Sequence, residues 1–258
     1  MGVKQLFDLA GRVAVVTGGS RGLGLQMAEA LGEMGARIAI TARKKDELED
    51  AVAHLKQLGI AATPYPSDLG KRDQVEPLAG ALLEKFGKVD ILVNNAGATW
   101  GAPAEDHPME AWDKLVNLNL SGLFLLSQFV AKRSMIPAKW GRIVNIASVN
   151  GLQATDMRLL KNAAYVATKH GVVGLTRQLA TEWGAHGITV NAICPGFFPS
   201  KMTKSTLDTA GEFVKQATPT GRLGGEEDLK GLVVLLASDA SRHITGQAIA
   251  VDGGATII

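Results

Sequence analysis

Residues 13–31 read VAVVTGGSRGLGLQMAEAL, and this stretch decides the fold. A short apolar run is followed by four glycines within seven positions and then by a helical pattern. Glycine lets the backbone turn tightly and approach a ligand, while a helix N-terminus offers unpaired N–H groups and a positive dipole end. The stretch therefore predicts a strand, a phosphate-binding turn and a helix, as in dinucleotide-binding folds, with an ordinary strand-to-helix turn as the alternative.

The rest of the chain repeats this alternation of short apolar runs and longer helical patterns. Strands are expected at 12–17, 37–41, 61–66, 89–94, 142–147, 188–193 and 248–252. Continuous apolar runs are typical of parallel strands that are buried on both faces. No repeat or linker interrupts the series, so we expect one α/β domain over residues 1–258, a Rossmann-type doubly wound sheet of about seven parallel strands flanked by helices.

Composition excludes several classes of protein. The chain of 258 residues is 46% apolar and 20% charged, as folded globular proteins are. Its formal net charge of +2 is spread along the chain, which argues against a nucleic-acid partner. The single cysteine, Cys194, excludes an intrachain disulfide, and the five histidines show no paired metal-ligand spacing. With no export signal and no apolar run near the ~20 residues of a membrane span, we expect a cytoplasmic protein without a membrane or metal partner.

A second stretch, AAYVATKH at 163–170, places Tyr165 one helical turn before Lys169. A tyrosine hydroxyl has an ordinary pKa near ~10, too high for ready proton exchange at neutral pH. A nearby ammonium group favours the phenolate, so Lys169 is expected to lower the pKa of Tyr165 toward useful acid–base work. The alternative is a half-buried tyrosine beside a lysine whose stem packs on apolar surface.

Three motifs together resemble the classical short-chain dehydrogenase/reductase family. They are Thr17-Gly18-x-x-x-Gly22-x-Gly24, Asn94-Asn95-Ala96-Gly97 and Tyr165-x-x-x-Lys169, in that order along the chain. The resemblance covers essentially the whole sequence. It implies an NAD(P)-dependent enzyme that interconverts a ketone and a secondary alcohol by direct hydride transfer, without a metal.

The resemblance also assigns catalytic roles. Tyr165 would exchange a proton with the substrate oxygen, Lys169 would also hold the nicotinamide ribose, and Ser148 would hydrogen-bond the substrate oxygen. Asn119 would hold a water that passes the proton onward; Asn117 is its competitor, but Asn119 is followed by Leu-Ser-Gly as in the family. Ser148 lies seventeen residues before Tyr165, more than is usual in the family, so the segment 151–162 must loop out.

Two arginines bear on the choice of cofactor. In dinucleotide folds an acid about 20 residues after the glycines accepts the adenosine ribose hydroxyls, whereas a cation there favours the 2′-phosphate of NADP. Here Ala42 stands where NAD-dependent members carry Asp, Arg43 follows it, and Arg21 lies within the glycine turn. We therefore expect NADP(H) rather than NAD(H); the alternative is that Arg43 and Lys44 form a solvated patch.

By resemblance, further residues that follow strand ends would contact the cofactor. Asp68 would contact the adenine, and the segment from Pro195 would cover the nicotinamide end. The full expected set is Gly18, Ser20, Arg21, Gly22, Leu23, Gly24, Arg43, Asp68, Leu69, Asn95, Ala96, Gly97, Tyr165, Lys169, Pro195, Gly196, Phe198 and Ser200.

Substrate choice is expected in three loops, at about 98–108, 150–162 and 197–218. Their apolar residues are Trp100, Leu152, Met157, Phe197 and Phe198, and their polar ones include Thr99, Asn150, Gln153 and Arg158. A 3-oxoacyl thioester or related β-keto compound fits this mixture best, and a keto-sugar acid, as in gluconate 5-dehydrogenase-like members, is the second hypothesis. The third is a non-catalytic nucleotide-binding module.

Self-association is also expected. The helices around 119–136 and 163–183 carry more apolar residues than one sheet face requires. In the family these helices pair across a two-fold axis, and the C-terminal GQAIAVDGGATII forms a second contact. The sequence does not separate a dimer from a tetramer.

Overall fold

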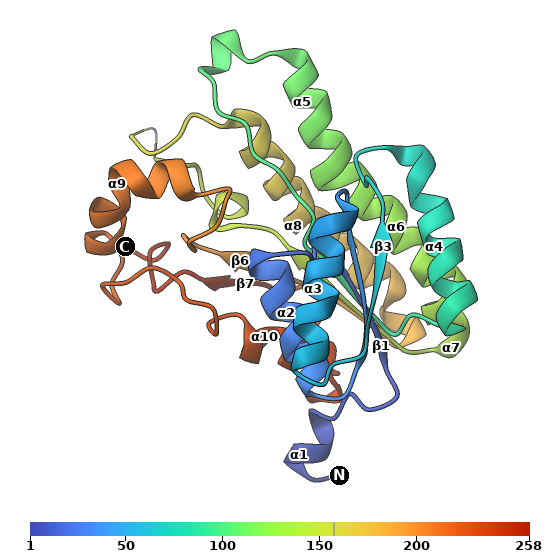
Figure 1. Ribbon diagram of the computed structural model, residues 1–258. Helices are drawn as coiled ribbons and strands as arrows, with labels where there is room; N and C mark the ends of the chain where they lie inside the picture. Colours follow the sequence, from blue (N-terminus) through green and yellow to red (C-terminus); the bar gives the residue numbers. More distant parts are fainter. Residues whose placement is uncertain (157) are drawn as a thin grey trace.

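The computed structural model describes residues 1–156 and 158–258. Its centre is one sheet of seven parallel strands in the order β3-β2-β1-β4-β5-β6-β7 (Figure 1). The strands are β1 (Val13–Thr17), β2 (Arg37–Ala42), β3 (Ala62–Pro66), β4 (Ile91–Asn94), β5 (Gly141–Ile146), β6 (Ile188–Pro195) and β7 (Ala248–Val251). All seven predicted strands are confirmed, and so is the doubly wound α/β fold. The order reverses between β1 and β4, which creates the crevice in which such folds bind ligands.

Helices cover both faces of the sheet (Figure 1). One face carries α2 (Gly22–Glu33), α3 (Lys45–Gln57) and α10 (Lys230–Ala237). The other carries α4 (Arg72–Phe86), α6 (Leu123–Val130) and α8 (Ala163–Trp183). The remaining helices are α1 (Val3–Leu6), α5 (Met109–Val116), α7 (Ile136–Ala138) and α9 (Lys204–Gln216), and α9 lies beside the C-terminal end of the chain.

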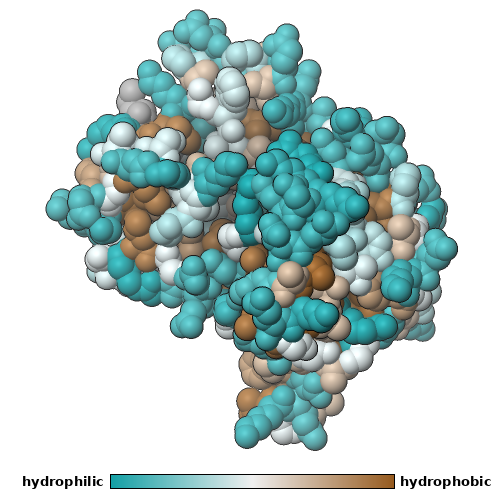
Figure 2. Space-filling model, viewed as in Figure 1, coloured by the Kyte–Doolittle hydropathy of each residue, from teal (hydrophilic) through white to brown (hydrophobic). Residues whose placement is uncertain are grey.

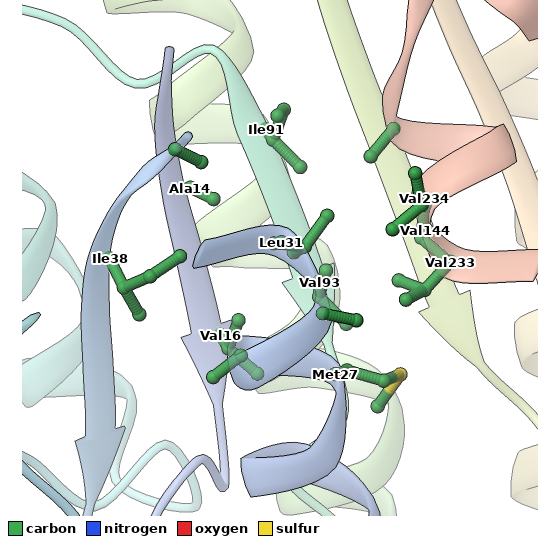
Figure 3. Close-up of a cluster of buried hydrophobic side chains, with 14 of the residues drawn as sticks. Ala14, Val16, Met27, Leu31, Ile38, Ile91, Val93, Val144, Val233 and Val234 are labelled. Atoms are coloured by element: carbon green, nitrogen blue, oxygen red, sulfur yellow. The ribbon is translucent and has the colours of Figure 1, made fainter. Parts of the chain in front are cut away.

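Alternation along the strands explains why they read as continuous apolar runs. In β1, Ala14 and Val16 point to the face where Met27 and Leu31 of α2 pack (Figure 3). Val15 between them packs against the opposite core, with residues of α4 and α6. Every residue of the central strands β1, β4, β5 and β6 is therefore buried on one face or the other, whereas the edge strands β3 and β7 are only partly buried.

A long helical run spans Met109–Ala138 and contains two π-helical segments, Asn117–Gly122 and Ala131–Met135. Pro137 explains the second, because proline lacks an N–H group and its ring displaces the preceding carbonyl groups. The first carries Asn119, and π-helical turns frequently occur at functional sites.

This run is also long and apolar enough to cross a membrane by length and composition alone, with a mean hydropathy of 1.2 over its most apolar window. Length and composition alone are weak evidence for a membrane span, because core helices of globular proteins satisfy the same criterion. In the structure 44% of that window is buried inside the protein.

Candidate active site

A cleft of about 530 Å³ opens at the carboxyl ends of β1, β2, β3 and β4. Gly24 shows why its rim is built from glycine: a Cβ there would lie 2.2 Å from the carbonyl oxygen of Gly18. Most of the residues expected to bind a cofactor line this cleft. They are Gly18, Ser20, Arg21, Gly22, Leu23, Gly24, Arg43, Asp68, Leu69, Asn95, Ala96, Gly97 and Ser200.

The cleft fits a nicotinamide dinucleotide. α2 begins at Gly22 with no side chain capping its first N–H groups, which leaves them available to a phosphate. The hydroxyls of Thr41, Ser67 and Thr99 line the cleft, and within the described part of the chain each is buried without a hydrogen-bond partner. Such orphaned groups indicate that a polar ligand completes the site.

Glu47 stands among the cations at the end of the cleft where strand β2 ends. Its carboxylate accepts hydrogen bonds from Nη1 of Arg21 at 2.8 and 2.9 Å and from Nζ of Lys44 at 3.0 Å. The Lys44 hydrogen bond is the main cause that lowers the pKa of Glu47, with the charges of Arg21, Lys44 and Lys201 adding to it. Arg43 is exposed and forms no ion pair with any residue in 1–156 or 158–258.

Asn95 braces the glycine turn. Its Nδ2 donates to the carbonyl oxygens of Thr17 at 2.9 Å and Gly18 at 3.1 Å. The backbone N–H groups of Asn95 and Ala96 both donate to Oγ1 of Thr17 at 2.9 Å. The Asn-Ala-Gly motif after β4 therefore holds the phosphate turn after β1, across the switch point of the sheet.

Ser148 and Tyr165 come together despite the long segment between them. Ser148 follows β5, and its Oγ accepts from the N–H of Asn150 at 3.1 Å. Burial raises the pKa of Tyr165, and a hydrogen bond with Ser148 partly opposes that rise. Ser148 therefore lies close enough to Tyr165 to affect its pKa, so the extra residues of the intervening segment do not keep the two side chains apart.

Lys169 lies beside Tyr165 on α8 but acts differently from the expectation. Its Nζ donates to the carbonyl oxygen of Ile146 at 2.7 Å and lies 5.5 Å from the centre of the Tyr165 ring. Burial lowers the pKa of Lys169 to about 8. The expectation that Lys169 brings the pKa of Tyr165 below its ordinary value is wrong for this structure, because desolvation raises the pKa of the phenol by more than its hydrogen bond with Ser148 lowers it.

Asn119 cross-links the loop after β4 to α8. Its Oδ1 accepts from the N–H of Ala98 at 2.9 Å, while its Nδ2 donates to the Ala98 carbonyl oxygen at 2.9 Å and to Oγ1 of Thr168 at 3.1 Å. Asn119 is only 1% exposed. Asn117 instead accepts from Arg72 at the surface. Of the two asparagines, Asn119 is thus the one that faces the Tyr165 helix, although its side chain is bonded to protein groups rather than free to hold a water.

A second pocket of about 320 Å³ lies between the segment after Ser148, α9 and the segment after β7. Asn150, Gln153 and Arg158 contribute polar groups, and Phe197 and Phe213 contribute apolar surface.

Gly196 and Phe198, expected at the cofactor, line this second pocket instead, and Pro195 is buried at the end of β6. Trp100 and Leu152 are 50% and 38% exposed and line neither cavity. Met157 lies outside the described residues.

Sequence reasoning missed several residues that line the cleft. Thr41 and Ser67 lie at or just after the ends of β2 and β3, a position that could have identified them. The others come from the start of α3, the loops after β4 and β6 and the first π-helical segment, and they carry no such signal; they are Lys44, Glu47, Ala98, Leu118, Lys201 and Met202. Cys194 is fully buried at the end of β6, and burial raises its pKa to about 11. Its thiol therefore stays protonated and packs as a small apolar side chain. No cluster of three or more potential metal ligands occurs among the residues that the structure describes.

Comparison with known proteins decides the family. The sequence profile of the short chain dehydrogenase family matches residues 12–211. The chain belongs to the short-chain dehydrogenase family. Like other members, it is an oxidoreductase that acts on CH–OH groups with a nicotinamide cofactor.

Individual members of the short-chain dehydrogenase family resemble this chain over its full length. It is 38% identical to a gluconate 5-dehydrogenase of Gluconobacter oxydans over 255 residues, 98% of each chain. It is 39% identical to the 3-oxoacyl-[acyl-carrier-protein] reductase of rhamnolipid biosynthesis in Pseudomonas aeruginosa, over 96% of this chain and 97% of that one. A crystal structure of a gluconate 5-dehydrogenase from Burkholderia cenocepacia with NADP and tartrate superposes with a TM-score of 0.93 at 35% identity, over 100% of both chains.

Proposed function

We propose that this short-chain dehydrogenase interconverts a ketone and a secondary alcohol with NADP(H), using Tyr165, Ser148, Lys169 and Asn119. One observation carries the proposal. Ser148 and Tyr165 interact near the end of β5, and Nζ of Lys169 lies 5.5 Å from the Tyr165 ring and 3.7 Å from the position of a Cβ on Gly97, a residue that lines the dinucleotide cleft.

Each side chain has a task that follows from its surroundings. When bound, the nicotinamide supplies or accepts the hydride. Ser148 holds the substrate oxygen, and Tyr165, which burial keeps protonated at neutral pH, donates its proton to that oxygen during reduction. Lys169, anchored on Ile146, stabilises negative charge as the proton leaves Tyr165. Asn119 fixes the distance between the loop after β4 and α8, so that the site keeps its geometry.

The roles of the two hydroxyls are tested by Y165F and S148A, assayed with NADPH on a panel of ketones. Y165F should lose turnover while still binding NADPH, because the ring that packs the site remains. Unchanged turnover in Y165F would favour a different acid. Absence of turnover in the wild-type protein on every ketone, with NADPH still bound, would favour the non-catalytic module.

The choice of NADP(H) rests on Arg43, Arg21 and Lys44 around the place where an adenosine ribose would lie. A planar guanidinium group matches a phosphate dianion, whereas the ribose hydroxyls of NAD donate hydrogen bonds and are best bound by an acceptor such as a carboxylate. That the Burkholderia relative was crystallised with NADP agrees with this proposal. R43A should weaken NADPH binding and leave NADH binding nearly unchanged, and an R43A protein that keeps its NADPH preference would refute the assignment.

For the substrate, the polar groups of the second pocket support a polyhydroxy ketone such as a keto-sugar acid. Asn150 and Gln153 offer hydrogen bonds to hydroxyls, and Arg158, whose Nε and Nη2 pair with Asp156, would offer its remaining nitrogen to a carboxylate. The 3-oxoacyl thioester, first by sequence, stays the second candidate because Phe197 and Phe213 supply an apolar wall. Comparing kcat/KM for the two substrate classes, in wild type and in Q153L, decides between them: Q153L should impair only the sugar acid.

We also propose a cytoplasmic, self-associating enzyme. The helical run Met109–Ala138 is less than half buried in its apolar window, and an identical subunit could cover the remainder. Sedimentation equilibrium of the purified protein without detergent tests this, and a monomer at all concentrations would contradict it.

A further inference from the structure

The end of the cleft where strand β2 ends carries a carboxylate among its cations. Hydrophilic side chains gather over the N-terminal end of α3, the helix that begins at this end of the cleft (Figure 2). Lys44 and Glu47 stand at the start of α3, Arg21 comes from the glycine turn, and Lys201 comes from the loop after β6. All four line the cleft. The carboxylate of Glu47 therefore already occupies the place where these cations converge.

The pairing of Glu47 is better formed than that of an ordinary surface carboxylate. Both of its oxygens accept from one nitrogen of Arg21, Lys44 adds a third bond, and the carboxylate side chain is 25% exposed. Its neighbour Glu49, two residues along the same helix, is 60% exposed and pairs with Lys45 at 3.5 Å. Glu47 thus neutralises cations of the cleft, whereas Glu49 pairs at the open surface.

We propose that Glu47 is a specificity-determining residue that weakens the preference for NADP(H) over NAD(H). This rests on the proposed NADP(H) function. A 2′-phosphate needs Arg21 and Lys44, and it must take them from Glu47 while its own negative charge lies near that carboxylate. NAD(H) carries a neutral hydroxyl at this position and leaves the Glu47 pairs intact. Binding of NADP(H) therefore requires the Glu47 ion pairs to break, whereas binding of NAD(H) does not. Glu47 lowers the affinity for NADP(H) alone.

Glu47→Gln tests the proposal by equilibrium binding, without any substrate turnover. NADPH and NADH are titrated by nicotinamide fluorescence, and adenosine 2′-monophosphate and 5′-monophosphate by calorimetry. Because two exposed ion pairs are released, E47Q should bind NADPH and the 2′-monophosphate roughly threefold to tenfold more tightly, with NADH and the 5′-monophosphate unchanged. E49Q removes the same charge from the same helix and should bind all four ligands like the wild type.

Two results would overturn the proposal. The first is E47Q with unaltered or weaker binding of NADPH and of the 2′-monophosphate. The second is a change confined to NADH, which would make Glu47 an acceptor for ribose hydroxyls instead. R43A in the same titrations separates failure of the proposed role of Glu47 from failure of the NADP(H) assignment. If R43A weakens NADPH while E47Q has no effect, only the role of Glu47 fails; if neither alters NADPH, the phosphate site itself is wrong.

Discussion

Replacement of Asn119 by alanine should destabilise the fold and disable the site together. The substitution leaves the N–H and the carbonyl oxygen of Ala98 without partners and removes one bond to Thr168. A buried backbone group that loses its partner costs roughly 1–3 kcal/mol, so two partly buried groups amount to about 3 kcal/mol. For a domain of this size the melting temperature should then fall by about 6–12 °C.

The assay is thermal unfolding of N119A beside N117A, followed by ketone reduction at a temperature where both are folded. Asn117 is the matched control, because its side chain accepts from Arg72 at the exposed side of the same π-helical segment, and N117A should lower the free energy of unfolding by at most about 0.5 kcal/mol. If N119A melts no lower than N117A, the cross-link from the loop after β4 to α8 does not stabilise the fold as argued. If N119A keeps full turnover, Asn119 does not position the site.

Three further outcomes follow from the geometry. Y165F should lower kcat by about 10²–10⁴ with NADPH affinity retained, as expected when a general acid is removed; a loss confined to KM would contradict this role. The pKa of Lys169 is about 8 in the folded protein and 10.5 ordinarily, so from pH 8 to 10.5 the unfolded chain holds a proton that the folded one has lost. Wild-type stability relative to K169M should therefore rise with pH across that window by up to about 3 kcal/mol, measured by urea unfolding; a flat or falling difference would show that Lys169 keeps its ordinary pKa. G24A should abolish nucleotide binding, because its Cβ would lie 2.2 Å from the Gly18 oxygen, whereas G80A, with nothing within 4 Å on α4, should bind normally.

The sheet could be predicted from the sequence because its signal is repeated and local. Strands β1, β5 and β6 are apolar runs with helical patterns on either side, and their burial on both faces leaves no competing pattern. The glycine turn was equally accessible, since the constraint at Gly24 is steric and acts within one turn of the chain. The positions that line the cleft after β1, β3 and β4 follow from the rule that ligands bind beyond strand ends.

What the sequence could not supply were interactions between segments far apart in the chain. The pairing of Arg21 with Glu47 joins residues 26 positions apart, and although Arg21 was expected at the cofactor, nothing in its segment indicates Glu47 as its partner. The burial of Tyr165 depends on how α8 packs against the end of β5, so the sequence revealed its neighbour Lys169 but not the desolvation that dominates its pKa. Phe198 was expected over the cofactor because it follows a strand, yet it is only 4% exposed and belongs to the core on the α2 face.

The pKa directions at Tyr165 and Lys169 divide the work between the two residues. Burial raises the pKa of the phenol and lowers that of the ammonium group to about 8, so both shifts favour the uncharged forms. At neutral pH the tyrosine therefore carries the proton that ketone reduction consumes, while Lys169 is still mostly charged and able to stabilise the phenolate left behind. Alcohol oxidation needs that phenolate at the outset, and raising the pH to form it also discharges Lys169 above about pH 8. In the proposed mechanism the two requirements conflict in that direction only, so we expect ketone reduction rather than alcohol oxidation to proceed best near neutral pH.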